Sequence, residues 1–140
     1  MQIKIKRLND ATHLEASNED GLTLQMDGSP DVGGKDLAMR PMQVLLSSLG
    51  GCSAMDVISI LNKQRQPLDD IQFTLDGTRE EGKVPAVFTK IHITYDLYGN
   101  LDEDKVKRAI DLSMQQYCSV TKMLEKTAKI TYSFKIHPSS

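Results

Sequence analysis

Two cysteines and one aspartate are the residues of this chain whose types and spacing best suit chemistry. Cys52 follows Gly50 and Gly51 within the apolar stretch LLSSLGGCSAMDVISIL, and Asp56 lies one helical turn further along. Cys118 is far away in sequence, in QQYCSVTKML. The N-terminus, MQIKIKRLND, alternates charge with Ile and has no apolar signal core, so we expect a cytoplasmic protein. In that compartment two cysteines are typical of free thiols or of a working redox couple.

The glycines beside Cys52 need a physical reason, because Gly costs about 1 kcal/mol relative to Ala inside a helix. One reason is the close approach of another element, and a second is space for a substrate beside the sulfur. A lone cysteine in an apolar helix is more often a small buried hydrophobe, and that interpretation stays open for both cysteines. Asp56 either accepts hydrogen bonds, from Arg40 or Ser53, or reaches solvent at the helix edge. Spacing alone does not show that the two sulfurs meet.

Composition and charge exclude several classes of protein. The 140 residues carry a net charge of −2 with scattered Lys and Arg, so no nucleic-acid partner is expected. Residues 41–61 are long enough to span a membrane, but their polar residues and Asp56 favour a buried helix and no membrane partner. The three histidines lack ligand spacing, so we expect neither metal nor cofactor. The length predicts a single domain over residues 1–140.

Apolar residues alternate in several short segments, which predicts β-strands. Three such segments lie at the start of the chain, at Ile3–Ile5, His13–Ala16 and Leu22–Met26. The loop DGSPDVGGKD follows them. Further alternation predicts strands over Ile71–Leu75, Ile91–Leu97 and Ile130–Ile136, the first two as an antiparallel pair.

Two helices are expected between these strands. Pro41 suits a first helical turn, and this helix should run to about Lys63. The second should open at Leu101–Asp104, where three acidic residues suit the helix dipole, and reach about Lys126. Its predicted buried stripe consists of Val106, Ala109, Ile110, Ser113, Tyr117, Val120 and Leu124. The order βββ-α-ββ-α-β predicts an α+β fold.

The two cysteine segments together resemble the OsmC/Ohr family, the osmotically inducible and organic hydroperoxide resistance proteins. The resemblance is carried by RPMQVLLSSLGGCSAMDVISIL and KRAIDLSMQQYCSVTKMLEKTAKITYSFKI, and it covers nearly the whole chain. It implies antiparallel β-sheets around two central helices and an intertwined homodimer. The glycines would then permit tight helix contacts around the cysteine.

The same resemblance implies a thiol peroxidase. Cys52 would attack an organic hydroperoxide and become a sulfenic acid, and Cys118 would condense with it to a disulfide. An external dithiol of the lipoyl type would restore both thiols. This chemistry requires thiolate character at Cys52, and therefore a nearby positive charge or hydrogen-bond donors.

The sequence departs from the active relatives at three points. Gln43 stands where they have an activating Glu, no Arg occurs around residues 32–34, and Ser119 replaces the Pro of their Cys-Pro-Val motif. Arg40 is the nearest candidate for the missing Arg. The alternative function is therefore a protein of the same fold that binds a small apolar ligand at the dimer cleft or senses oxidants. Methionines 26, 39, 42, 55 and 114 are candidates to line its pocket.

Overall fold

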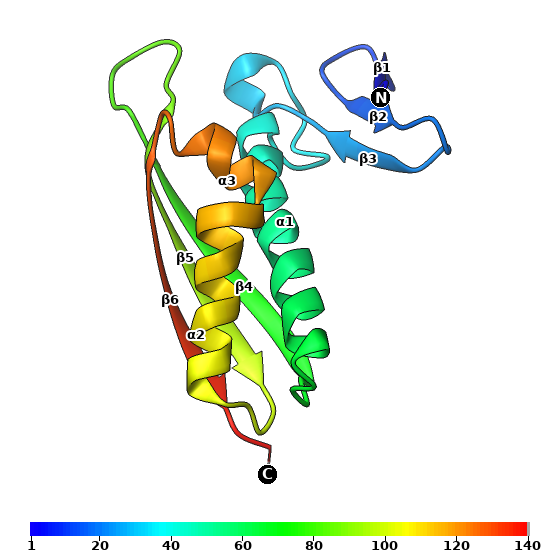
Figure 1. Cartoon of the computed structure of the whole chain (residues 1–140). Helices are drawn as coiled ribbons and strands as arrows, with labels where there is room; N and C mark the ends of the chain where they lie inside the picture. Colours follow the sequence, from blue (N-terminus) through cyan, green and yellow to red (C-terminus); the bar gives the residue numbers. More distant parts are fainter. Residues whose placement is uncertain (140) are drawn as a thin grey trace. The chain divides into compact units, whose positions relative to one another are not determined.

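A computed structural model describes residues 1–139 and has a mixed α+β architecture (Figure 1). The chain divides into an N-terminal unit, residues 1–45, and a C-terminal unit that begins at Leu46. Each unit has its own three-stranded sheet. The element order agrees with the order expected from the sequence, and the α+β class is confirmed.

The N-terminal unit is an antiparallel sheet of three short strands. These are β1 (Lys4–Arg7), β2 (Leu14–Ser17) and β3 (Thr23–Met26), paired in the order β1-β2-β3. The turn between β2 and β3 contains Gly21 at φ +82°, a conformation in which glycine has no steric cost. The strands therefore lie close to the positions that sequence alternation predicts.

Asp27 organises the loop that follows β3. Its carboxylate accepts hydrogen bonds from Thr12 Oγ1 at 2.7 Å and from the backbone N–H groups of Gly28, Lys35 and Leu37. The hydrogen bond from Thr12 is the largest of the effects that hold the pKa of Asp27 well below its usual range. The loop also contains the 3₁₀ turn η1 (Pro30–Val32). The loop is therefore ordered by hydrogen bonds to the Asp27 carboxylate.

The sheet of the C-terminal unit is mixed rather than antiparallel. Strands β4 (Asp70–Arg79) and β5 (Phe88–Tyr98) form the expected antiparallel pair, but β6 (Lys129–His137) pairs with β5 in parallel. The prediction of purely antiparallel sheets was therefore wrong at this edge. The reason is topological: β5 and β6 are joined by a helical crossover, and such a crossover returns the chain in the same direction.

One face of this sheet forms the core of the C-terminal unit. Along β5, alternate residues from Ile91 to Leu97 are fully or almost fully buried, and the residues between them are only half-buried. The helices α1 (Pro41–Lys63) and α2 (Glu103–Leu112) lie side by side over the sheet (Figure 1). The apolar alternation therefore points toward these helices, as expected for a sheet with one solvated face.

Helix α1 has the predicted bounds, and its glycines have different surroundings. A Cβ at Gly50 would lie 2.8 Å from Leu75 Cδ1, so this glycine permits close packing of α1 on β4. A Cβ at Gly51 would meet no atom within 4 Å. By length and composition α1 is the one described helix that could cross a membrane. Only 28% of the most apolar 18-residue stretch of α1 is buried within the chain.

The second predicted helix is interrupted at Cys118. Helix α2 ends at Leu112, the π-helical turn η2 (Ser113–Tyr117) follows, and α3 (Ser119–Leu124) begins after Cys118 in extended conformation. Because a π turn is wider than an α turn, the phase of the buried stripe shifts. Tyr117, predicted to be buried, is 56% exposed, whereas Cys118 is completely buried. The sequence prediction was wrong on this point.

Candidate functional site

The two cysteines and Asp56 meet in the C-terminal unit. Cys52 Sγ, Cys118 Sγ and a carboxylate oxygen of Asp56 all lie within 4.8 Å of one another. Cys52 and Asp56 come from adjacent turns of α1, and Cys118 comes from the junction between η2 and α3. Both cysteines are free thiols. The tertiary structure therefore brings together two sulfurs that are remote in sequence.

The two thiols differ in environment. Cys52 is half-buried, whereas Cys118 is fully buried. Burial raises the pKa of the Cys118 thiol, and the neighbouring Cys52 sulfur raises it as well. The backbone N–H of Thr121 donates to Cys118 Sγ at 3.4 Å, and this contact fixes the sulfur at the start of α3. Cys118 is thus a protonated, oriented thiol, while Cys52 is the more accessible sulfur.

A buried chain of hydroxyl groups ends at Asp56. Ser113 Oγ donates to Asp56 Oδ2 at 3.0 Å, Ser53 Oγ lies 2.9 Å from Ser113 Oγ, and Tyr95 Oη lies 2.6 Å from Ser53 Oγ. Each hydroxyl has one hydrogen to donate. Because the hydrogen of Ser113 goes to Asp56, Ser53 must donate to Ser113, and Tyr95 must donate to Ser53.

This direction of donation agrees with the environment of Tyr95. Burial raises the pKa of Tyr95 far above its usual value, so the phenol keeps its proton. All three hydroxyl groups therefore donate in the direction of Asp56. The Asp56 carboxylate, which lies beside the two sulfurs, is thus held by a hydrogen-bonded chain that begins in the core. Sequence reasoning named Ser53 only as a possible direct partner of Asp56, and it did not find Tyr95 as part of the site. The only signal was the presence of Ser53 and Ser113 at positions otherwise occupied by apolar core residues.

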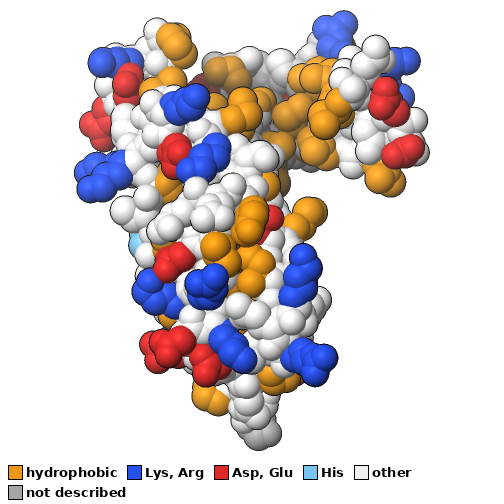
Figure 2. Space-filling view, in the orientation of Figure 1, with side chains coloured by type: hydrophobic (Ala, Val, Ile, Leu, Met, Phe, Trp, Pro, Cys, Tyr) orange, Lys and Arg blue, Asp and Glu red, His pale blue; other side chains and the backbone are white. Residues whose placement is uncertain are grey.

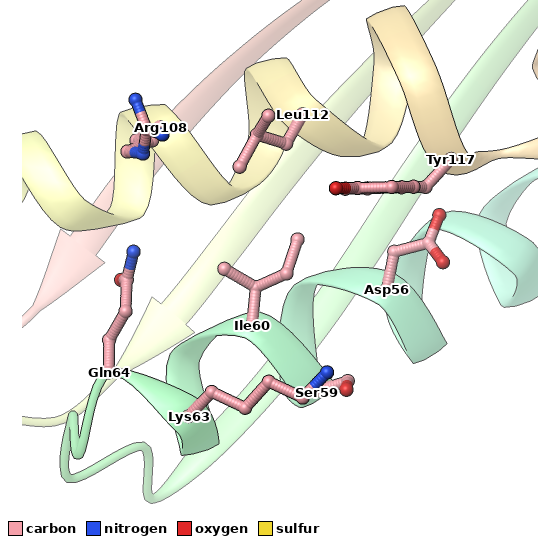
Figure 3. A pocket seen from close by; sticks show the side chains of 8 residues that line it. All are labelled: Asp56, Ser59, Ile60, Lys63, Gln64, Arg108, Leu112 and Tyr117. Atoms are coloured by element: carbon pink, nitrogen blue, oxygen red, sulfur yellow. The ribbon is translucent and has the colours of Figure 1, made fainter.

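A groove of about 580 Å³ opens beside Asp56. It runs between α1 and α2, with Asp56 and Tyr117 near one end and Gln64 and Arg108 near the other (Figure 3). Ile60 and Leu112 face each other across its middle (Figure 3). None of the five methionines proposed to line a pocket is among its lining residues, which are Asp56, Ser59, Ile60, Lys63, Gln64, Arg108, Leu112 and Tyr117.

The surface around the groove combines apolar and basic side chains. Figure 2 shows exposed hydrophobic side chains along the helical face of this unit, with Lys and Arg side chains and some Asp and Glu side chains around them, and the basic residues that line the groove are Lys63 and Arg108. Gln64 Oε1 is buried and has no hydrogen-bond partner among the described residues. The groove therefore offers apolar contact and positive charge to a bound molecule.

Arg40 and Gln43 belong to the N-terminal unit. Gln43 Oε1 accepts a hydrogen bond from the backbone N–H of Arg40 at 2.9 Å, which is half of a capping box at the start of α1. The Arg40 guanidinium forms an ion pair with Asp36 and donates to the Ala38 carbonyl at 3.1 Å. Both residues thus have defined roles at the helix start. Asp56 accepts from Ser113, rather than directly from the Ser53 hydroxyl, one of the partners that the sequence suggested.

The histidines serve the sheets. His13 contacts Gln25, His92 contacts Thr131 and Ser133, and His137 contacts Asp96, in each case through a ring nitrogen. His92 and His137 thus make polar contacts between neighbouring strands, and His13 makes one just before β2.

The fold and the pair of neighbouring cysteines define the class of this α+β protein, and comparison with known proteins identifies its family. The family model described as OsmC-like protein matches residues 33–133, and the chain belongs to this family. It is 40% identical to Protein YhfA of Escherichia coli K12 over 137 residues, which cover 97% of this chain and 98% of that protein. The resemblance seen in the sequence is thereby confirmed.

Solved structures have the same fold. A hypothetical protein from Aquifex aeolicus VF5 superposes with a TM-score of 0.86 at 29% identity, covering 99% of this chain and 97% of that one. An organic hydroperoxide resistance protein OsmC from Legionella pneumophila superposes with a TM-score of 0.70 at 16% identity, covering 96% and 97% of the two chains. At that low identity the second likeness establishes the fold alone.

Proposed function

We propose that the protein is a cytoplasmic cysteine-based peroxidase that reduces organic hydroperoxides to alcohols. The Cys52 thiolate attacks the distal oxygen of ROOH, the O–O bond breaks, and the products are Cys52–SOH and ROH after proton uptake by the leaving alkoxide. The Cys118 thiol then displaces water from the sulfenic acid and forms the Cys52–Cys118 disulfide. An external dithiol, of the lipoyl type by family resemblance, then reduces the Cys52–Cys118 disulfide to two thiols and is itself oxidised to a disulfide.

The observation that carries this proposal is the meeting of the two sulfurs. They lie within 4.8 Å of each other, and the accessible one belongs to the helix that the family uses for attack. A disulfide requires an S–S bond of about 2.05 Å, so resolution requires a side-chain rotation and a small local shift. The difference in burial supports an attacking role for Cys52 and a resolving role for Cys118.

Asp56 takes the position of the proton acceptor in this proposal. Gln43 carries no charge with which to activate a thiol, and Arg40 forms an ion pair with Asp36. The Asp56 carboxylate lies beside both sulfurs and is oriented by Ser113. We propose that it accepts the Cys52 proton before the thiolate attacks, which is general-base catalysis and requires side-chain rotation to bring the carboxylate within hydrogen-bonding reach of the sulfur.

The test is thiol counting with cumene hydroperoxide, because Cys52 and Cys118 are the only cysteines of the chain. We expect one equivalent of peroxide to remove both thiols of the reduced protein. Cys118→Ser should consume one equivalent and accumulate a sulfenic acid that dimedone traps, and Cys52→Ser should consume none. Thiols that survive excess peroxide would refute the proposal, as would unchanged turnover in Cys52→Ser.

A second candidate function rests on the groove. Its apolar middle and its basic end suit a small apolar ligand with a polar group, independently of any peroxide. This protein would bind a ligand or sense oxidants rather than turn over. A ligand that copurifies and is lost in Ile60→Asp, together with thiols inert to peroxide, would favour this function over the first.

We also propose that the working form is a homodimer in which α1 is covered by a second copy. Only 28% of the apolar 18-residue stretch of α1 is buried within the chain, and Met55 on this helix is 74% exposed. Burying such side chains stabilises association by about 25 cal/mol per Å² of apolar surface. Met55→Lys should therefore shift the protein to monomer in analytical ultracentrifugation. Thr74→Lys, which adds the same charge on the exposed sheet face, is the matched control.

A further inference from the structure

The cysteine–aspartate cluster also has the composition of a metal site. Two sulfurs and one carboxylate oxygen lie within 4.8 Å of one another. In a tetrahedral zinc site with Zn–S bonds of about 2.3 Å, two sulfurs are about 3.8 Å apart. The two sulfurs therefore need to approach each other by about 1 Å at most, which rotation of the two cysteine side chains can supply. No metal motif is visible in the sequence because Cys118 is remote from the other two ligands.

The ligands are held by regular structure. Cys52 and Asp56 are separated by four residues on α1, and residues at this spacing project from the same helix face, as the paired ligands of helical zinc motifs do. Cys118 joins them from the junction between the π turn and α3, where the helix is interrupted. Two ligands from one helix and one from a hydrogen-bonded junction form a preorganised set.

Hydrogen bonds of the kind that orient metal ligands are present. Ser113 Oγ donates to Asp56 Oδ2 at 3.0 Å and is itself held by Ser53 and Tyr95. The N–H of Thr121 donates to Cys118 Sγ at 3.4 Å. Such outer contacts fix ligand orientation, and their loss typically weakens metal binding 10- to 100-fold.

The site is open on one side. Asp56 lines the groove between α1 and α2, and Cys52 is half-buried. Three protein ligands with an open fourth position leave room for water or a small ligand on the metal. Thiolate ligands favour Zn²⁺ over Mg²⁺ and Ca²⁺, which prefer all-oxygen sites.

We propose that the reduced protein binds one Zn²⁺ per chain through Cys52 Sγ, Cys118 Sγ and the Asp56 carboxylate. Binding releases the two thiol protons to solvent, involves no change of oxidation state, and places a net charge of −1 on the metal and its three ligands. It is incompatible with the Cys52–Cys118 disulfide, because both sulfurs are committed to the metal. The inference does not depend on peroxidase activity.

The experiment is a competition titration of the reduced, metal-free protein with Zn²⁺ and a chromophoric chelator, with Co²⁺ as a spectroscopic probe. We expect one Zn²⁺ per chain and, with Co²⁺, a sulfur-to-cobalt charge-transfer band with tetrahedral d–d absorption. Cys52→Ser and Cys118→Ser should each weaken binding about 100-fold or more, and Asp56→Asn about tenfold. Circular dichroism checks that each variant is folded.

Asp111→Asn is the matched control, because Asp111 forms an ion pair with Lys107 and accepts a hydrogen bond from Tyr132. The zinc affinity of this variant should equal that of the wild type. Equal affinity in all variants, or no binding above that of the Cys52→Ser/Cys118→Ser double variant, would overturn the proposal. Zinc stoichiometry is read without peroxide, and peroxide consumption is read on metal-free protein. Failure of one proposal is therefore distinguishable from failure of the other.

Discussion

The buried hydroxyl chain gives a quantitative prediction for Ser53→Ala. Ser53 Oγ accepts from Tyr95 Oη at 2.6 Å, and all of these groups are fully buried. Removing Ser53 Oγ leaves the Tyr95 hydroxyl in the core without its partner. A buried donor that loses its acceptor costs about 1–3 kcal/mol, and we expect Ser53→Ala to lower the free energy of unfolding by this amount. Ser113 loses the hydrogen bond that it accepts from Ser53, but it still donates to Asp56.

A double-mutant cycle isolates this interaction. Tyr95→Phe removes the hydroxyl itself, and it should cost about 1 kcal/mol for the lost hydrogen bond. Once that hydroxyl is absent, Ser53→Ala no longer leaves an unsatisfied donor. The double variant should therefore be more stable than the sum of the single effects predicts, by about 1 kcal/mol or more.

The assay is urea unfolding of the wild type, the two single variants and the double variant. Protein concentration is held constant, because association would otherwise contribute to the apparent stability. Equal m-values would show that the transition compares the same states. Additivity within about 0.5 kcal/mol would refute the assigned chain of donation.

Three further predictions concern titration and reactivity. Iodoacetamide should alkylate Cys52 at least about tenfold faster than Cys118, because Cys118 is buried and its thiol pKa is raised, and peptide mass spectrometry would contradict this if the rates were equal. Asp27→Asn should speed hydrogen exchange of the loop amides that donate to Asp27. Since the folded pKa of Asp27 is lowered, this stabilisation is present above about pH 4 and declines as the pH falls below it, so the two proteins should converge in acid. Since the folded pKa of Tyr95 is raised, wild-type stability should decline as the pH rises above about 10; equilibrium unfolding should show a smaller decline in Tyr95→Phe, and equal declines would contradict the assignment.

Local sequence patterns predicted the elements well where local physics decides them. The alternation in residues 91–97 identified β5, and Pro41 marked the beginning of α1. The same reasoning failed at Tyr117, because a strict helical period does not anticipate a π turn. It also failed for the pairing of β6, because strand direction depends on the route of the whole crossover.

For the site, the sequence supplied the reactive types and the tertiary structure supplied their relation. Residue spacing placed Cys52 and Asp56 on one helix face, because helical geometry is set within a few residues. It left open whether Cys118 joins them, since that depends on the packing of α1 against the η2–α3 junction. The fold brings the sulfurs together, buries one of them and directs three hydroxyl hydrogens toward Asp56. These features depend on contacts between distant segments, which a linear pattern does not encode.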